Sequence, residues 1–306
     1  MAWLLLVALF VLPLLLLYSV HSSRRRAFSL DGRVVLITGA GHGLGRCLAR
    51  TLAARANLAA LVLLDVDTHA LEQLKGDPRV LVAVCDVSDD EAVAACVARV
   101  CEQLGRRVDV LVNNAGVVSG RSLLALPPAR VRRTFAVNAL AHFWTVRAVL
   151  PGMLVDPTRD ALIVTVSSMM ALAGSAGLTD YCASKAALQR DRVAHVRTLL
   201  VCPSAVDTGM FAGAFAGGGW RLRFARWLVP FLDEQEVADR IVAAMASDRQ
   251  QLLVCARGWR GWLLPWGPAL VRLLPVALMD ALVGLAGGHH GMSSFVGRAD
   301  TVATTR

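Results

Sequence analysis

A tyrosine and a lysine stand four residues apart in the segment Tyr181-Cys-Ala-Ser-Lys185, and a serine pair, Ser167-Ser168, precedes them. On a helix such residues share a face, so the two side chains point the same way. A tyrosine of pKa about 10 is a poor base at neutral pH. A cation about 4 Å away, at an effective dielectric constant near 20, is worth about 4 kcal/mol, or about three pKa units. We therefore expect Lys185 to lower the pKa of Tyr181, so that the phenol oxygen takes an alcohol proton while Ser168 holds the alcohol oxygen.

A second candidate group is rich in glycine and follows a short apolar run at residues 33–38. Its sequence is Gly39-Ala-Gly-His-Gly43-Leu44-Gly45, and a predicted helix at residues 46–56 comes next. Glycines let the backbone turn sharply and approach a pyrophosphate, and the helix start adds N–H donors and a positive dipole. The sequence thus predicts a dinucleotide-binding turn that uses Gly39, Gly43, Leu44 and Gly45.

Acidic residues at two predicted strand ends indicate which dinucleotide binds. Asp65 lies 20 residues after Gly45, where a carboxylate accepts a hydrogen bond from a ribose 2′-hydroxyl. The same carboxylate would repel a 2′-phosphate, so NAD is the expected cofactor and NADP the less favoured one. Asp86 and Val87 end the third predicted strand, where they are placed to meet the adenine.

Short apolar runs predict the elements that position these residues. Strands are expected at residues 33–38, 60–65, 80–86, 108–113, 161–167 and 196–202, with helices chiefly at 46–56, 89–104 and 129–150. Continuously apolar strands that alternate with helices are typical of a parallel sheet covered on both faces. We predict an α/β fold: a Rossmann-like, doubly wound parallel sheet in one domain, with an N-terminal membrane anchor and an apolar C-terminal extension.

The motifs follow the order found in the short-chain dehydrogenase/reductase superfamily. They are Thr38-Gly39-x-x-x-Gly43-x-Gly45, Asn113-Asn114-Ala115-Gly116, Asn138, Ser167-Ser168 and Tyr181-x-x-x-Lys185. From about residue 31 to residue 210 the chain resembles this superfamily, and in particular its membrane-associated retinol and 17β-hydroxysteroid dehydrogenase branch. Features of that branch are the apolar N-terminus, Val201-Cys-Pro203, Thr208-Gly-Met-Phe211 and Gly291-Met-Ser-Ser-Phe295-Val-Gly297.

The resemblance implies an enzyme that transfers hydride between a lipophilic alcohol, retinol or a 17β-hydroxysteroid, and NAD, forming the aldehyde or ketone. It implies that Asn138 supports a water relay to bulk solvent. Lys185 would also bind the hydroxyls of the nicotinamide ribose. Further cofactor contacts are implied for Asn114, Ala115, Gly116, Tyr181, Val206 and Thr208.

An apolar segment opens the chain. Residues 2–18 carry no charge, and Arg24, Arg25 and Arg26 follow them. As a helix these residues span about 25 Å, slightly less than a hydrocarbon core of about 30 Å. Because the basic cluster follows the apolar run and the cleavage site is poor, a retained anchor is favoured over a cleaved signal. The positive charges after the apolar run predict that the catalytic domain lies in the cytosol. The expected membrane is the endoplasmic reticulum or a lipid droplet. Pro13 also allows a shallow hairpin.

The composition limits the classes of partner that the protein is expected to bind. A net charge of +9 suits nucleic acid or an anionic membrane, but the mean hydropathy of +0.54 favours the membrane, and no nucleic-acid-binding signature occurs. The seven cysteines include no C-x-x-C pair and are expected as free thiols in a reducing compartment. No metal site is expected, since the adjacent His289 and His290 point different ways.

The predicted domains are an anchor at 1–20, a basic linker at 21–30, the NAD-binding domain at 31–250 and an apolar extension at 251–306. Trp220, Phe224, Trp227 and Phe231 are spaced to form one helical stripe, which either packs on the core or dips into a membrane surface. Trp259, Trp262 and Trp266 repeat aromatic residues beside arginine. The expected partners are a lipophilic small molecule, the membrane surface and a second copy in a homodimer, and no nucleic acid.

The segment from Tyr181 to Pro203 is shorter than the family usually has. A return helix needs about 11–13 residues to cross a strand length, so the helix is expected to end near Arg190-Asp191-Arg192 with nothing left for loops. This departure leaves open a catalytically impaired scaffold of the same fold. A second alternative is an NADPH-dependent carbonyl (retinal) reductase that runs the same site in reverse.

Overall fold

The computed structural model describes residues 27–172, 174, 176–188, 195–211, 223, 227, 230–247, 251–254, 292 and 295. Its centre is a seven-stranded sheet in the order β3-β2-β1-β4-β5-β6-β7, with parallel neighbours throughout. The strands are β1 (Val34–Thr38), β2 (Ala60–Asp65), β3 (Val80–Val84), β4 (Val110–Asn113), β5 (Ala161–Val166), β6 (Val196–Pro203) and β7 (Gln251–Val254). This is the predicted Rossmann-like sheet.

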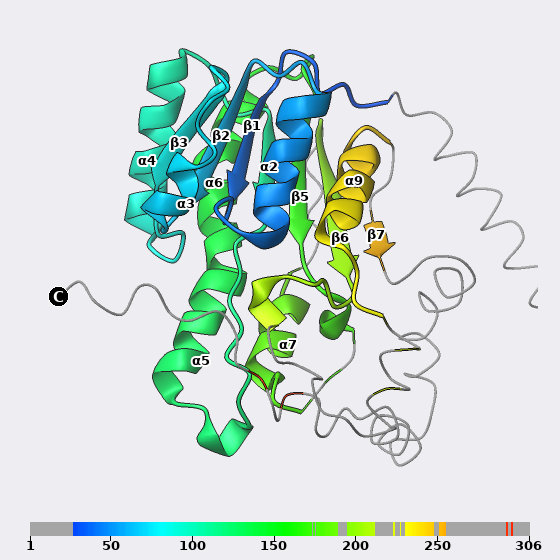
Figure 1. The fold of residues 1–306 in the computed structure, drawn as a ribbon. Coiled ribbons are helices and arrows are strands. Elements are labelled where there is room, and N and C mark those ends of the chain that lie inside the picture. The colour runs from blue at the N-terminus through cyan, green and yellow to red at the C-terminus, as the bar shows by residue number, and fades with distance from the viewer. Residues whose placement is uncertain are drawn as a thin grey trace, which may run out of the picture.

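Helices cover both faces of the sheet (Figure 1). One face carries α2 (Gly43–Arg55) and α9 (Glu234–Met245), and the other carries α4 (Asp90–Leu104) and α6 (Ala141–Leu154). The remaining described helical segments are α3 (Thr68–Glu72), α5 (Pro128–Phe135), α7 (Thr179–Ala186), the 3₁₀ turns η1 (Leu123–Ala125), η3 (Met169–Ala171) and η4 (Gly209–Phe211), and the π turn η2 (Ala136–Leu140).

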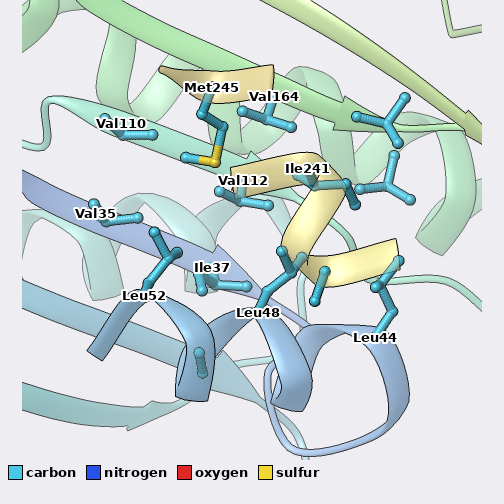
Figure 2. Packing of buried hydrophobic residues seen from close by; sticks show 14 of the residues in the cluster. Val35, Ile37, Leu44, Leu48, Leu52, Val110, Val112, Val164, Ile241 and Met245 are labelled. Carbon is cyan, nitrogen blue, oxygen red and sulfur yellow. The ribbon is translucent and has the colours of Figure 1, made fainter. Parts of the chain in front are cut away.

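The packing under α2 and α9 fixes where the glycine turn lies. Leu44, Leu48 and Leu52 recur every four residues on α2 and are buried against the sheet. Figure 2 shows them facing Ile37 of β1, with Ile241 and Met245 of α9 completing the layer. Fully burying one such side chain is worth about 1.5–3 kcal/mol. The start of α2 is thereby held at the carboxyl end of β1.

Strand order reverses between β1 and β4, because the chain runs outward from β1 through β2 to β3 and then returns to β4. In such sheets ligands bind outside the carboxyl ends of the strands at this reversal. Thr38, Asn113 and Ser168 all stand at or just beyond the ends of their strands. The topology therefore collects the predicted site residues at one edge.

Most predicted strands and helices are confirmed to within two residues at each end. The predicted helix at 129–150 is instead α5, the π turn η2 and α6 in succession, since a π turn inserts at Asn138. The helix carrying Tyr181 ends at Ala186, earlier than predicted, yet β6 still pairs with β5 from Val196 onward. The sheet also includes β7, which the prediction had placed in the C-terminal extension.

Several predictions lie outside the described residues: the anchor at 1–20, most of the basic linker, Trp220, Phe224, the tryptophans from 259 to 266, and His289-His290. Among the described helices, none has the length and apolar character that crossing a membrane requires. Trp227, from the predicted aromatic stripe, lies within the described residues and is 54% exposed. No disulfide joins the six cysteines that lie in the described part of the chain.

Candidate active site

The turn between β1 and α2 is packed so closely that side chains do not fit. Gly39 has φ +64°, in the left-handed region that favours glycine. A Cβ placed on Gly45 would lie 2.1 Å from the Gly39 carbonyl oxygen and 2.6 Å from Nδ2 of Asn114. Gly43 also has a positive φ, of 48°, at the first turn of α2, and Leu44 is buried beside it. A ligand can therefore approach the main chain here, and the turn fits the predicted pyrophosphate.

Asp65 lies directly against this turn. Its Oδ2 accepts a hydrogen bond from the Gly41 N–H at 2.8 Å, and its Oδ1 accepts from the Asp67 N–H at 3.0 Å. Each carboxylate oxygen has a further lone pair, and the residue is only half-buried. A ribose hydroxyl at the turn could therefore donate to Asp65, which is what discrimination for NAD requires.

Asp86 and Val87 follow β3, beside the end of β2. The Oδ1 of Asp86 accepts from the backbone N–H and hydroxyl of Ser88 at 3.0 and 2.7 Å, and Oδ2 lies 3.5 Å from Arg133. Burial alone would raise the pKa of Asp86, but the Ser88 hydrogen bonds and the Arg133 charge outweigh it and lower the pKa. Asp86 is thus a structured turn residue, and Val87 is buried next to it.

The Asn113-Asn114-Ala115-Gly116 segment joins β4 to the glycine turn. Asn114 donates from Nδ2 to the carbonyls of Thr38 and Gly39 at 3.0 and 3.1 Å. The N–H groups of Asn114 and Ala115 both donate to the Thr38 hydroxyl at 3.1 Å. A Cβ on Gly116 would lie 3.5 Å from both Asn138 Oδ1 and Lys185 Nζ. The segment therefore connects the expected nucleotide turn to the expected catalytic group.

Ser168 and Tyr181 come together at the end of β5. Ser168 precedes η3, where its Oγ accepts from the Met170 N–H at 3.1 Å. Tyr181 lies in the first turn of α7 and is 5% exposed. Burial raises the pKa of Tyr181 to about 12, against a side-chain hydrogen bond with Ser168 that lowers it. The two hydroxyls are therefore neighbours, which is what a shared hold on one alcohol oxygen needs.

Lys185 lies one turn further along α7, yet the pKa of Tyr181 is raised and not lowered as expected. Its ammonium donates to the Val166 carbonyl at 2.8 Å. Burial lowers the pKa of Lys185 itself to about 8, while Cys202 raises it slightly. The expected lowering of the Tyr181 pKa is not found in the protein alone, because burial of the phenol has the larger effect and raises the pKa.

Asn138 occupies the π turn and is completely buried. Its Oδ1 accepts from the Val117 N–H at 2.8 Å, and Nδ2 donates to the Val117 carbonyl at 2.9 Å and the Ser184 hydroxyl at 3.1 Å. Ser184 lies between Tyr181 and Lys185 on α7. The amide thus fixes α7 against the loop after β4, and π turns are frequent at functional sites.

His142 is a buried residue of this region that the sequence analysis missed. It follows Asn138 by four residues, so the helical spacing that identified Tyr181 and Lys185 could have found it. Burial lowers the pKa of His142 to about 3, the Lys185 charge lowers it further, and the Ala115 backbone raises it slightly. Neither ring nitrogen makes a hydrogen bond of good geometry within the described part of the chain. The ring is therefore neutral at physiological pH.

Val206 and Thr208 lie in the loop after β6, as predicted. Val206 forms an isolated bridge with Leu232, and the Thr208 N–H donates to the Val206 carbonyl at 2.7 Å. Val206 is buried and Thr208 is half-buried. Because β6 is the neighbour of β5, this loop follows the same edge of the sheet as Ser168.

An apolar cluster surrounds Tyr181. Its buried members are Leu178, Tyr181, Cys182 and Met292, and Val118, Met170 and Phe295 pack against them half-buried. A Cβ on Gly177 would lie 2.9 Å from the Met292 Cβ, and one on Gly120 would lie 2.1 Å from the Phe295 ring. The late Gly-Met-Ser-Ser-Phe motif thus contributes two side chains to the surroundings of Tyr181.

Comparisons with known proteins agree with this geometry. The family model for short chain dehydrogenase matches residues 33–217. Retinol dehydrogenase 10-B of Danio rerio is 40% identical over 226 residues, which cover 62% of this chain and 66%, just under two thirds, of that protein. Human epidermal retinol dehydrogenase 2 is 32% identical over 287 residues, covering 88% of this chain and 86% of that protein.

Solved structures are similar as well. A short chain dehydrogenase/reductase from Burkholderia phymatum, in complex with NAD, has a TM-score of 0.67 and 28% identity, covering 80% of this chain and 95% of that one. The ligand-free aldohexose dehydrogenase of Thermoplasma acidophilum has a TM-score of 0.62 and 26% identity, covering 74% and 93%.

Proposed function

Because the chain belongs to the short-chain dehydrogenase family and is an oxidoreductase, we propose that it oxidises a lipophilic alcohol with NAD as hydride acceptor. Retinol is the first candidate substrate and a 17β-hydroxysteroid the second. One observation carries the proposal: the neighbouring hydroxyls of Ser168 and Tyr181 are surrounded by the apolar cluster of Leu178, Cys182 and Met292. An apolar alcohol loses little hydration there, whereas a sugar would leave polar groups without partners.

In this proposal the catalytic residues are Ser168, Tyr181, Lys185 and Asn138. Ser168 orients the alcohol oxygen, and the Tyr181 phenol oxygen takes its proton. Lys185 binds the nicotinamide ribose and Asn138 supports the path of the proton to solvent. When bound, the nicotinamide supplies the hydride acceptor and a positive charge beside the phenol. Tyr181 needs that added charge, since burial holds its pKa near 12 in the protein alone.

We assign the cofactor contacts to the glycine turn, the strand ends and the loop after β6. The residues are Gly39, Gly43, Leu44, Gly45, Asp65, Asp86, Val87, Asn114, Ala115, Gly116, Tyr181, Lys185, Val206 and Thr208. The position of Asp65 against Gly41 favours NAD over NADP, because a 2′-phosphate would meet its carboxylate. Neither alternative gains support: a non-catalytic scaffold does not need the Ser168–Tyr181 pair, and NADPH would face Asp65.

We also propose that the protein works on a membrane, the endoplasmic reticulum or a lipid droplet, with its catalytic domain in the cytosol. The apolar residues 2–18 and the three arginines after them support this location. A homodimer is proposed as well, supported by two exposed apolar side chains next to each other on one side of α6 and η2, Leu140 and Phe143.

The substrate proposal is tested by NADH formation in membranes that contain the full chain. Retinol, a 17β-hydroxysteroid and a linear fatty alcohol are compared, with a sugar alcohol as the polar control. We expect oxidation of the lipophilic alcohols and loss of at least about a thousandfold in rate for Tyr181→Phe, which lacks the group that takes the proton. Equal rates for the wild type and Tyr181→Phe would refute the proposed chemistry.

A further inference from the structure

The loop between β4 and α5 exposes two adjacent leucines, Leu123 and Leu124. Leu123 is 63% exposed and Leu124 fully exposed, at 101% of its reference area. Within the stretch 121–130 only Leu126 is buried, so that side chain holds the loop while its neighbours project. Two adjacent leucines offered to solvent at a loop tip need an explanation, since soluble surfaces seldom present them together.

Arginine predominates among the charged residues around this tip. Residues 110–155 contain no Asp or Glu and include Arg121, Arg130, Arg132, Arg133 and Arg147. Four of these, Arg121, Arg130, Arg132 and Arg133, lie in the loop or on α5 and are exposed. Carboxylates that approach α5 from other described elements include Asp86, 3.5 Å from Arg133, and the buried Asp180, which accepts from Thr134 at 2.7 Å. The exposed loop and α5 therefore keep a positive balance.

The loop that carries the tip also contacts the apolar cluster around Tyr181. It begins with Val118, which packs in that cluster, and with Gly120, which lies against the Phe295 ring. Figure 1 shows α5 and the loop before it extending beyond the carboxyl end of the sheet, on the same side as α7. The tip and the proposed catalytic residues are therefore on the same side of the sheet.

We propose that the tip, Leu123 and Leu124 with the arginines at 121, 132 and 133, docks on an anionic lipid surface. The leucines enter the boundary between headgroups and acyl chains, and the arginines bind lipid phosphates and carboxylates. A protruding pair of leucines suits a lipid surface better than a second protein copy, which would need a broad complementary face. The inference deepens the proposed function, on which it rests: an apolar alcohol dissolved in the membrane enters the pocket beside the docked loop.

The test uses the full chain in vesicles of phosphatidylcholine with or without phosphatidylserine. A photoactivatable benzoylphenylalanine replaces Leu124 in one variant and Val155 in the other. Val155 is the matched control, because it is also apolar and 80% exposed but follows α6 at the opposite edge of the sheet. Mass spectrometry counts the lipid adducts at each position. Attachment through any other segment of the chain would not place lipid on residue 124.

We expect adducts at position 124 at least about fivefold above those at 155, and fewer when phosphatidylserine is omitted. Equal adducts at both positions, no adducts at 124, or cross-links from 124 to a second copy of the chain would each overturn the proposal.

A second variant separates docking from catalysis. Leu123→Ser combined with Leu124→Ser should slow oxidation of retinol held in vesicles, by about fivefold or more, and leave the rate on detergent-dissolved retinol unchanged. Equal slowing in both media would contradict a docking role. If the wild type oxidises no alcohol in either medium, the proposed function fails, while the adducts at position 124 still decide the docking proposal.

Discussion

At the scale of single residues, burial of Tyr181 affects its pKa more than the shared helix face with Lys185 does. Tyr181 and Lys185 share a helix face as the sequence predicts, but the Lys185 ammonium binds the Val166 carbonyl at 2.8 Å. The pKa of Tyr181 rises to about 12 because the phenol is buried. A tyrosine in this state holds its proton until a positive group arrives. In the protein alone Tyr181 is therefore protonated and cannot take a proton from an alcohol. Its action as a base depends on a positive group, such as the nicotinamide, that binds beside it.

The tightest contact in the nucleotide turn belongs to Gly45. Gly45→Ala would bring a Cβ to 2.1 Å from the Gly39 carbonyl oxygen, so the turn must open. We expect the affinity for NADH, measured by fluorescence titration, to fall by at least about tenfold. Gly152→Ala is the control, since its Cβ would meet only the Arg107 side chain at 3.4 Å. Unchanged affinity in Gly45→Ala would show that the dinucleotide binds elsewhere.

The charge of Asp65 is expected to set cofactor preference. Asp65→Asn removes the negative charge and keeps an oxygen that can accept from Gly41 or Asp67. The ratio of kcat/KM for NADP to that for NAD should rise by about tenfold or more, equivalent to about 1.4 kcal/mol. Steady-state kinetics with both cofactors measure it. A wild type that already prefers NADP would make the assignment of Asp65 wrong.

His142 should make the protein sensitive to acid. Its pKa is about 3 in the folded protein and about 6.5 when unfolded, so the unfolded chain binds the extra proton between these values. His142 therefore does not lower the free energy of unfolding above about pH 6.5. As the pH decreases from 6.5 toward 3, the free energy of unfolding falls by up to about 1.4 kcal/mol per pH unit. Denaturant unfolding at pH 7 and pH 5 should show a smaller loss for His142→Leu than for the wild type. The exposed His69→Gln serves as control, and an equal loss in all three proteins would contradict this account.

At the scale of elements, the π turn joins two parts of the site. Asn138 makes three hydrogen bonds, to both backbone groups of Val117 and to Ser184. Asn138→Ala should lower the free energy of unfolding by about 3 kcal/mol, at about 1 kcal/mol for each bond. The exposed Asn57→Ala should change it by less than about 0.5 kcal/mol. Chemical denaturation measures both, and similar values for the two variants would mean that Asn138 does not tie α7 in place.

The sequence predicted elements well where one local signal dominates. The runs at 60–65 and 196–202 are mostly apolar, and they form β2 and β6 with matching starts. The π turn at Asn138 was missed because nothing in residues 129–150 interrupts the helical pattern. β7 was missed because four residues carry too little periodicity, and only pairing with β6 makes them a strand.

The site was predictable in part for a related reason. Motif spacing gave Gly45, Asp65 and Ser168, since strand ends in a parallel sheet meet at one edge. Spacing could not give the position of the Lys185 ammonium or the burial of His142. Both depend on contacts between elements far apart in sequence, such as the approach of α7 to the Val166 carbonyl.

At the scale of the whole molecule, the residues at the amino ends of the strands and those at the carboxyl ends have different roles. At the amino end, buried Asp109 binds Arg159 at 2.7 and 2.8 Å and accepts from the Val34 N–H at 2.9 Å. Through these bonds Asp109, just before β4, connects the start of β1 with Arg159, just before β5. The carboxyl end carries the glycine turn, the Ser168–Tyr181 pair and the apolar cluster. We therefore expect catalysis at the carboxyl end of the sheet.

Transfer of hydrogen from alcohol to cofactor tests this account most directly. Retinol carrying deuterium at its carbinol carbon is incubated with NAD and membranes that contain the full chain, and NADH is analysed by mass spectrometry. We predict deuterium on the nicotinamide ring with the wild type, and none above background with Tyr181→Phe, although that variant still binds NADH. NADH without deuterium, or equal labelling with both proteins, would contradict it.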